Sequence, residues 1–229
     1  MARSDSSNLE VLYEDNHLIA VNKKPGDIVQ GDKTGDTPLS EIVKEYLKAK
    51  YDKPGNVFLG VVHRLDRPTS GIVIFAKTSK ALSRLNSAFA QGKTKKTYWA
   101  MVKKVPQGPT MTLTHWLVRN PKQNKSYAHS KEVAHSKKAI LSYTIRSQLD
   151  SYTLLEIDLK TGRHHQIRAQ LAAINCSIKG DLKYGAARSN PDGSIHLHAR
   201  CLSLEHPVKK EPMEFMAPTP KDALWDAVP

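Results

Sequence analysis

Three short segments of this chain combine residue types that can do acid–base or nucleophilic chemistry next to positive charge. The first, His63–Arg67, places one carboxylate, Asp66, between two arginines directly after an apolar stretch. Neighbouring cations favour the ionised carboxylate, which can act as a nucleophile or stabilise a developing positive charge. A purely structural interpretation is also open, in which Asp66 caps a turn with Thr69 and Ser70.

The second segment, Lys95–Ala100, sets two lysines before a tyrosine and a tryptophan in a strand-like stretch. A cation there could bind a phosphate while an aromatic ring stacks on a base. The alternative is an ordinary strand in which the rings of Tyr98 and Trp99 belong to the core.

The third segment, Thr161–Arg168, contains a glycine turn that we expect to open a helix over residues 164–174. In such a helix Arg168 would share one face with His164 and His165. Main-chain N–H groups at the helix N-terminus would add to the attraction for an anion. A solvated basic face with a buried ion pair is the structural alternative.

The elements that must position these segments are short strands and few helices. Strands are predicted at 18–21, 57–62, 72–76, 97–102, 139–146, 152–159 and 195–201, and helices at 39–47, 79–91 and 164–174. Strands that follow one another in pairs predict an α+β fold with a mainly antiparallel sheet, rather than a doubly wound parallel one.

Domain organisation is expected to be simple. We expect a flexible N-terminus over residues 1–9 and a single catalytic domain over 10–229. Residues 103–138 are predicted to be irregular, because they contain three prolines and many Lys and His residues, and the region could be an insertion that touches a ligand. The tail, 207–229, carries five prolines and is expected to be extended or looped.

The charge is the most unusual property of the composition. Among 229 residues, 35 Lys and Arg stand against 22 Asp and Glu, so the net charge is +13. A polyanion is therefore the first partner to consider, either nucleic acid or an acidic membrane surface. The apolar runs are far shorter than the roughly 20 residues that span a bilayer. No secretory signal is visible, and two cysteines indicate buried thiols in a reducing cytoplasm.

No metal or nucleotide cofactor is expected. The chain has no CxxC or HExxH motif, and the histidine pairs at 164–165 and 196–198 do not have zinc-finger spacing. Gly60 and Gly71 do not fit a phosphate-binding glycine loop.

Together these segments resemble the RluA family of RNA pseudouridine synthases, over about residues 10–217. The matching motifs are His-Arg-Leu-Asp closing on Thr-Ser-Gly (63–71), Lys-x-Tyr-x-Ala (96–100), Thr-Gly-Arg-x-His-Gln-Ile-Arg (161–168), Gly-Asp-x-x-Tyr-Gly (180–185), and Leu-His-Ala (197–199) followed by His-Pro (206–207). Tyr-Glu-Asp (13–15) and Lys-Pro-Gly (24–26) resemble the family's opening, although the usual residue between Pro and Gly is absent.

The resemblance implies a pseudouridine synthase core with a central RNA-binding cleft, which isomerises uridine in structured RNA without a cofactor. Asp66 would be the essential carboxylate, acting on the uracil ring or on the sugar, and Arg168 would pair with it. Tyr98 would stack on the flipped uracil. Arg64 would fill the gap that base flipping leaves, and Leu197 would be the apolar residue of the pocket.

The resemblance also implies contacts to RNA or to the protein itself for Arg67, Arg163, His165 and Gln166. Many relatives carry a small RNA-binding module before the core, where this chain has about ten residues. Target choice is then expected to depend on the core. The expected partner is a stem–loop of ribosomal or transfer RNA, with no membrane and no obligatory protein partner, and the expected state is a cytoplasmic monomer.

Two other function classes are compatible with parts of the pattern. A non-catalytic RNA-binding protein would fit the charge, but binding alone does not need a carboxylate inside a polyanion site. A glycosidase would need two carboxylates flanking the bond, and a two-metal nuclease would need a carboxylate cluster. The motifs supply a single carboxylate.

Overall fold

The computed structural model describes residues 3–228, and the chain divides into two compact units. The first unit runs up to Thr94 and includes Ala199–Pro220. The second contains Lys95–His198 and the residues from Lys221 onward. The single catalytic domain over 10–229 stays a prediction.

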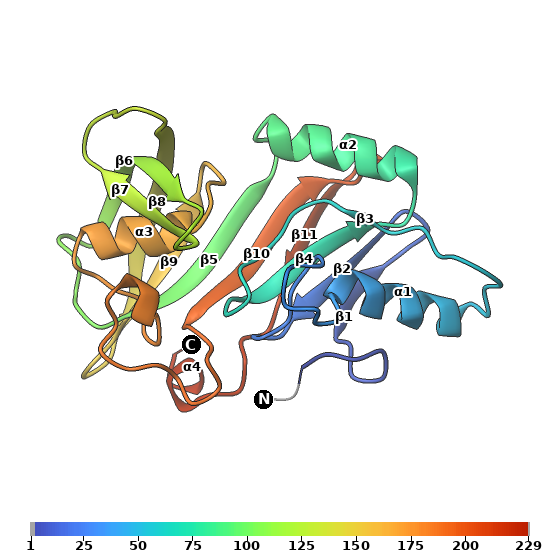
Figure 1. Cartoon of the computed structure of the whole chain (residues 1–229), viewed down its shortest axis with the longest axis horizontal. Helices are drawn as coiled ribbons and strands as arrows, with labels where there is room; N and C mark the ends of the chain where they lie inside the picture. Colours follow the sequence, from blue (N-terminus) through green and yellow to red (C-terminus); the bar gives the residue numbers. More distant parts are fainter. Residues whose placement is uncertain (1–2, 229) are drawn as a thin grey trace. The chain divides into compact units, whose positions relative to one another are not determined.

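The first unit is an antiparallel sheet with two helices (Figure 1). Its strands are β1 (Val11–Glu14), β2 (Leu18–Lys23), β3 (Gly60–Val61), β4 (Ser70–Ala76), β11 (Pro212–Met216) and most of β10 (Leu197–Glu205). Its helices are α1 (Leu39–Lys50) and α2 (Ser79–Ala90). The strand order is β1-β2-β4-β10, with β3 beside β4 and β11 beside β10.

Strand β4 is the core of this unit. All seven of its residues are buried, as a continuous apolar run predicts for a strand covered on both faces. It pairs with β2 in antiparallel register from Leu18 opposite Ala76 to Lys23 opposite Gly71. Because β4 begins directly after the Asp66 segment, the pairing of β4 with β2 fixes the position in space of the last residues of that segment.

The second unit is a five-stranded antiparallel sheet with short helices. Its strands are β5 (Lys95–Val102), β6 (Thr110–Asn120), β7 (Lys125–His129), β8 (Lys137–Gln148) and β9 (Thr153–Leu159), in the order β5-β9-β8-β6-β7. Its helices are α3 (Gln166–Ala173), the 3₁₀ turn η1 (Leu182–Tyr184) and α4 (Ala223–Asp226). Helix α3 packs through Ala169 on Leu117 of β6 and Ala139 of β8.

The predicted α+β class with a mainly antiparallel sheet is confirmed. The predicted strand at 57–62 is much shorter in the structure, where β3 has two residues. The tail is not only extended or looped, because it contains β11 and α4. Asp222 caps α4 by accepting a hydrogen bond from the N–H of Leu224, and Trp225 packs against Met101 and Leu154.

The prediction that residues 103–138 are irregular is wrong. They contain β6, β7 and the start of β8, and β6 pairs with both of the other strands. Pro109 lies just before β6 and Pro121 just after it, so the prolines mark the ends of the strand rather than interrupting it. Within β6, Leu113 and Leu117 are buried while alternate threonines face outward.

The N-terminal residues that the structure describes make specific contacts. The main-chain N–H of Ser4 donates to Asp27 Oδ1 (3.1 Å), and its hydroxyl donates to Asp27 Oδ2 (2.7 Å). These bonds join the start of the chain to the loop after β2.

Candidate active site

Asp66 lies in a turn that leads into β4 in the first unit. The N–H of Thr69 donates to the main-chain oxygen of Asp66 (3.0 Å), so the backbone of Asp66 closes this turn. Asp66 itself is half-buried in this turn.

The side chain of Lys23 is buried and forms hydrogen bonds with the main chain of this turn. Lys23 is 1% exposed, and its Nζ donates to the main-chain oxygens of Arg67 (3.1 Å) and Thr69 (2.7 Å). Burial lowers the pKa of Lys23 to about 7, although the carboxylates of Asp27 and Asp66 oppose this shift. At neutral pH this buried lysine beside the Asp66 turn is therefore only partly protonated.

The two arginines beside Asp66 differ in their surroundings. Arg64 is exposed. Arg67 binds Asp36 Oδ2 (2.7 Å) and the hydroxyl of Thr34 (2.7 Å), both in the loop between β2 and α1. The side chain of Arg67 thus joins the Asp66 turn to that loop.

Gly71, at the start of β4, is required by a close approach of two strands. Its φ is +112°, and a Cβ atom there would lie 2.4 Å from the main-chain oxygen of Ala199 in β10. Only glycine fits both conditions. The glycine of the first motif thus lets β10, the strand that begins at Leu197, lie against the strand that follows Asp66.

In the second unit, Tyr98 lies on β5 opposite Ile157 of β9 and is 9% exposed. Burial lowers the pKa of Lys96, which precedes it on the same strand. A Cβ atom on Gly162 would lie 3.8 Å from Lys96 Nζ. The structure therefore brings the second and third motifs together within this unit.

The helix predicted over residues 164–174 begins later than predicted, within the third motif. Helix α3 starts at Gln166, and His165 before it has a left-handed backbone (φ 52°). His164 and His165 are therefore not on a helical face with Arg168, and that expectation is wrong. The reason is the side chain of Gln166, which accepts hydrogen bonds from the Thr161 hydroxyl (2.8 Å) and the Arg163 N–H (3.0 Å) and closes a non-helical turn.

Arg168 is buried and bound to an acid of its own unit. Its Nε and Nη2 donate to the two carboxylate oxygens of Asp181, at 2.7 and 2.8 Å. Its guanidinium carbon also lies 5.0 Å from the ring centre of Tyr184. Asp181 and Tyr184 belong to the Gly-Asp-x-x-Tyr-Gly motif, but the sequence alone assigned them no role. The predicted pairing of Arg168 with Asp66 stays a prediction.

The two histidines before α3 join the third motif to the hairpin of β6 and β7. His165 Nδ1 lies 3.0 Å from the hydroxyl of Tyr184. His164 stacks on His165 with ring centres 3.8 Å apart, and its ring nitrogens lie 2.8 Å from Ser126 Oγ and 3.1 Å from Asn124 Oδ1. His164 occupies the variable position of the motif, so the motif did not predict these contacts.

Leu197 is buried at the start of β10, between two histidines that contact the C-terminal helix. His196 stacks on Trp225 with ring centres 5.2 Å apart, and its Nε2 lies 2.9 Å from Asp222 Oδ1. The ring centre of His198 lies 6.1 Å from that of Trp225. The C-terminal segment therefore fixes the backbone on both sides of Leu197.

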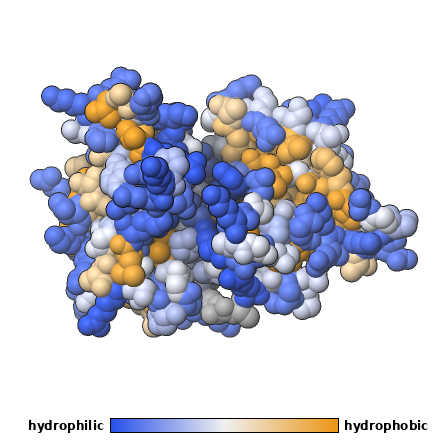
Figure 2. Space-filling view, in the orientation of Figure 1, coloured by the Kyte–Doolittle hydropathy of each residue, from blue (hydrophilic) through white to orange (hydrophobic). Residues whose placement is uncertain are grey.

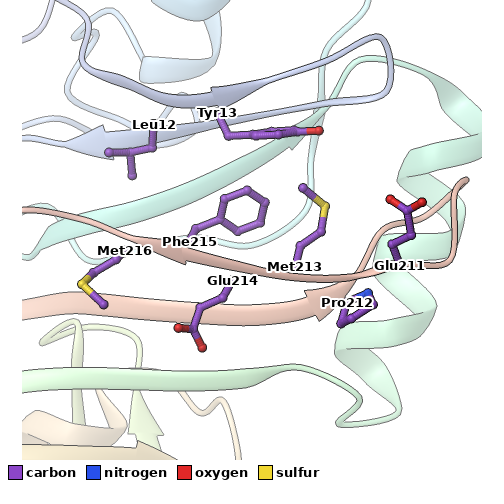
Figure 3. Close-up of a pocket in the computed structure, with 8 residues that line it drawn as sticks. All are labelled: Leu12, Tyr13, Glu211, Pro212, Met213, Glu214, Phe215 and Met216. Carbon is purple, nitrogen blue, oxygen red and sulfur yellow. The ribbon is translucent and has the colours of Figure 1, made fainter.

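A shallow pocket of the first unit, with a volume of about 390 Å³, contains none of the predicted catalytic or RNA-binding residues (Figure 3). It is lined by Leu12, Tyr13, Glu211, Pro212, Met213, Glu214, Phe215 and Met216. Among residues 3–228, no group of three or more His, Cys, Asp or Glu is placed to hold a metal ion. Within the same range, the helices are all too short or too polar to cross a membrane.

A family model described as RNA pseudouridylate synthase matches residues 17–173, which is more than half of the chain. The chain belongs to this family. The matched range contains the three motif segments with Asp66, Tyr98 and Arg168. As a member, the chain is an isomerase that acts on RNA, and the resemblance drawn from the motifs is confirmed.

Individual relatives agree with this assignment. An uncharacterized RNA pseudouridine synthase from Chlorobaculum parvum is 34% identical over 236 residues, covering 93% of this chain and 72% of the relative. Ribosomal large subunit pseudouridine synthase D from Xylella fastidiosa is 31% identical, covering 93% and 67%. The structure of human RNA pseudouridylate synthase domain containing 4 has the same fold, with a TM-score of 0.77, 23% identity, and coverage of 93% and 89%.

Proposed function

We propose that this chain converts uridine to pseudouridine in structured ribosomal or transfer RNA, with Asp66 as the essential carboxylate. The observation that carries the proposal is the Asp66 turn. The N–H of Thr69 closes its backbone, and the buried Nζ of Lys23 donates to the main-chain oxygens of Arg67 and Thr69. The turn is therefore held in place directly before β4, and it lies within the range that the family model matches, which supports the assignment of the chemistry to the Asp66 carboxylate.

The isomerisation conserves every atom of the nucleotide. The N1–C1′ bond breaks, a C5–C1′ bond forms, C5 loses a proton and N1 gains one. No oxidant, reductant or cofactor is needed for this balance. Asp66 takes part as a carboxylate that attacks or stabilises either the uracil ring or C1′ of the sugar.

The other catalytic residues act around Asp66 in this proposal. Arg168, whose orientation is set by Asp181, pairs with Asp66 and holds it in place. Tyr98 stacks on the flipped uracil and helps to move the proton that leaves C5. Arg64, which is exposed beside Asp66, fills the gap in the RNA, and Leu197 forms the apolar side of the uracil pocket.

The four residues predicted to contact either RNA or the protein itself differ in their surroundings. Gln166, His165 and Arg67 make hydrogen bonds within the protein, which supports a structural role for them. Arg163 Nε also donates to the main-chain oxygen of Lys138 (3.0 Å), but Arg163 is exposed and follows the glycine turn of the third motif, which supports a contact to phosphate. The net charge of +13 favours RNA binding as a whole.

The substrate class follows from the comparisons and from the family resemblance. The Xylella fastidiosa relative is named for the large ribosomal subunit, which supports ribosomal RNA as a substrate. A relative from Pectobacterium carotovorum, 31% identical, is named tRNA pseudouridine synthase C, which supports transfer RNA as the alternative substrate. We further propose that the chain works in the cytoplasm as a monomer, with no obligatory protein partner and no membrane.

Mapping pseudouridines in ribosomal and transfer RNA, from cells with and without this chain, tests the proposal. We expect one or a few uridines to lose their modification when the gene is deleted. The purified protein should restore pseudouridine at the same positions in RNA from the deletion strain. Unchanged modification at every position in both RNA classes would contradict the proposal.

A further inference from the structure

An exposed aromatic ring lies among cations on the hairpin of β6 and β7. Tyr127 of β7 is 41% exposed. The Nζ of Lys125 lies 5.4 Å from the ring centre of Tyr127 and 5.1 Å from that of Tyr184. The guanidinium carbon of Arg168 lies 5.0 Å from the centre of the same Tyr184 ring. Rings and cations thus alternate from the surface to the buried arginine.

The hairpin is held in a fixed position relative to Arg168. The main-chain N–H of Ser126 donates to the hydroxyl of Tyr184 (2.8 Å), and that hydroxyl donates to the main-chain oxygen of Ser126 (3.2 Å). Lys183 Nζ donates to the main-chain oxygen of Asn124 at the hairpin tip (3.1 Å). Together with the contacts of His164, these bonds make Tyr127 part of a rigid surface within the second unit.

The segment around Tyr127 is strongly positive. Residues 110–138 contain six cations, Arg119, Lys122, Lys125, Lys131, Lys137 and Lys138, and a single acid, Glu132. In the upper left of Figure 1, where the hairpin lies, Figure 2 shows hydrophilic and apolar residues side by side. A protein partner would not need so many like charges, whereas a nucleic acid matches them.

We propose that Tyr127, with Lys125, forms a platform on which an unpaired nucleotide of the RNA substrate stacks. The proposal rests on the proposed function and names a feature of its substrate. An unpaired base offers its π face to the tyrosine ring, and its phosphates are attracted by the lysines. A base inside a duplex has both faces covered by its neighbours. The platform therefore selects RNA with unpaired nucleotides near the target uridine, such as a loop or a bulge.

Two RNA probes separate stacking from phosphate attraction: a fluorescein-labelled 12-nucleotide oligouridylate, and a labelled 12-base-pair RNA duplex. Binding of each is titrated at one salt concentration with the wild-type protein and the Tyr127→Ala and Tyr127→Phe variants. Phe58→Ala is the matched control, because Phe58 is an aromatic residue that is 49% exposed in the other unit. Thermal melting of each variant shows that it is folded.

We expect Tyr127→Ala to weaken oligouridylate binding roughly 5-fold to 100-fold, which is the range for loss of one base–aromatic stack. Duplex binding should change less than about twofold, because phosphate attraction is kept. Tyr127→Phe keeps the ring and should bind like wild type, as should Phe58→Ala. Unchanged oligouridylate binding by Tyr127→Ala, or an equal loss for both probes, would overturn the platform. Neither result bears on pseudouridine formation, which is measured separately.

Discussion

Arg168 and Asp181 form a bidentate ion pair, in which two guanidinium nitrogens meet both carboxylate oxygens at 2.7 and 2.8 Å. The side chains are 6% and 1% exposed. Two parallel charge-assisted hydrogen bonds fix the plane of the guanidinium as well as its position. The direction of Arg168 is thus set by the protein before any RNA binds.

Replacing Asp181 by Asn should therefore impair both folding and activity. Breaking a buried ion pair by removing one partner costs about 3–5 kcal/mol, so the free energy of unfolding in urea should fall by up to roughly that amount. Single-turnover pseudouridine formation, corrected for the folded fraction, should also slow because Arg168 loses its fixed orientation. Asp150→Asn, an exposed change in the same unit, is the control and should alter neither quantity. A folding free energy within about 0.5 kcal/mol of wild type would mean that the pair is not structurally important.

Lys23 gives the stability of the protein a distinct pH dependence. Its pKa is about 7 in the folded state and 10.5 in the unfolded chain, so between these values the unfolded state binds more protons. The free energy of unfolding should then rise with pH, by up to about 1.4 kcal/mol per pH unit from this one group. Lys23→Met removes the contribution. We measure the free energy of unfolding of both proteins from pH 7 to 9. The value for wild type minus the value for the variant should increase with pH. A constant difference would show that Lys23 keeps its ordinary pKa.

Gly71→Ala tests the close approach of β4 and β10. The added methyl group would overlap the backbone of Ala199, and the positive φ is strained for alanine. We expect a loss of about 3 kcal/mol or more in unfolding free energy. Gly35→Ala is a matched control, because Gly35 also has a positive φ (+74°) but nothing lies within 4 Å of its Cβ position. The control should lose only about 1 kcal/mol. Equal losses in the two variants would show that the backbone angle alone makes glycine necessary at position 71.

The sequence was most informative where local pattern decides structure. The apolar run of β4, the alternation in β9 and the order of the motifs were enough to predict an α+β fold and the family. The start of α3 could not be predicted, because the Gln166 side chain closes its turn through bonds to Thr161 and Arg163. The hairpin of β6 and β7 was missed because prolines at strand ends look like prolines in loops.

Partners that are distant in sequence were also beyond prediction. Asp181 lies 13 residues after Arg168, and nothing in the spacing indicates which acid the arginine meets. Lys23 lies 46 residues before Thr69, and no sequence pattern indicates that its ammonium ends beneath the Asp66 turn. Both contacts depend on tertiary packing that only the folded structure provides.

Asp66→Asn decides whether this carboxylate carries the reaction. Asparagine has nearly the same shape but is a poor nucleophile, so the protein should fold and bind RNA while the reaction stops. The control is Asp52→Asn, an exposed position in the same unit with a positive φ (45°) that asparagine tolerates.

The measurement is the release of tritium from C5 of labelled uridine in ribosomal and transfer RNA, followed together with thermal melting. We expect release by Asp66→Asn to fall at least a thousandfold, about 4 kcal/mol in the activation free energy, with wild-type release by Asp52→Asn. Release at the wild-type rate by a folded Asp66→Asn protein would contradict the assignment of Asp66 as the essential carboxylate.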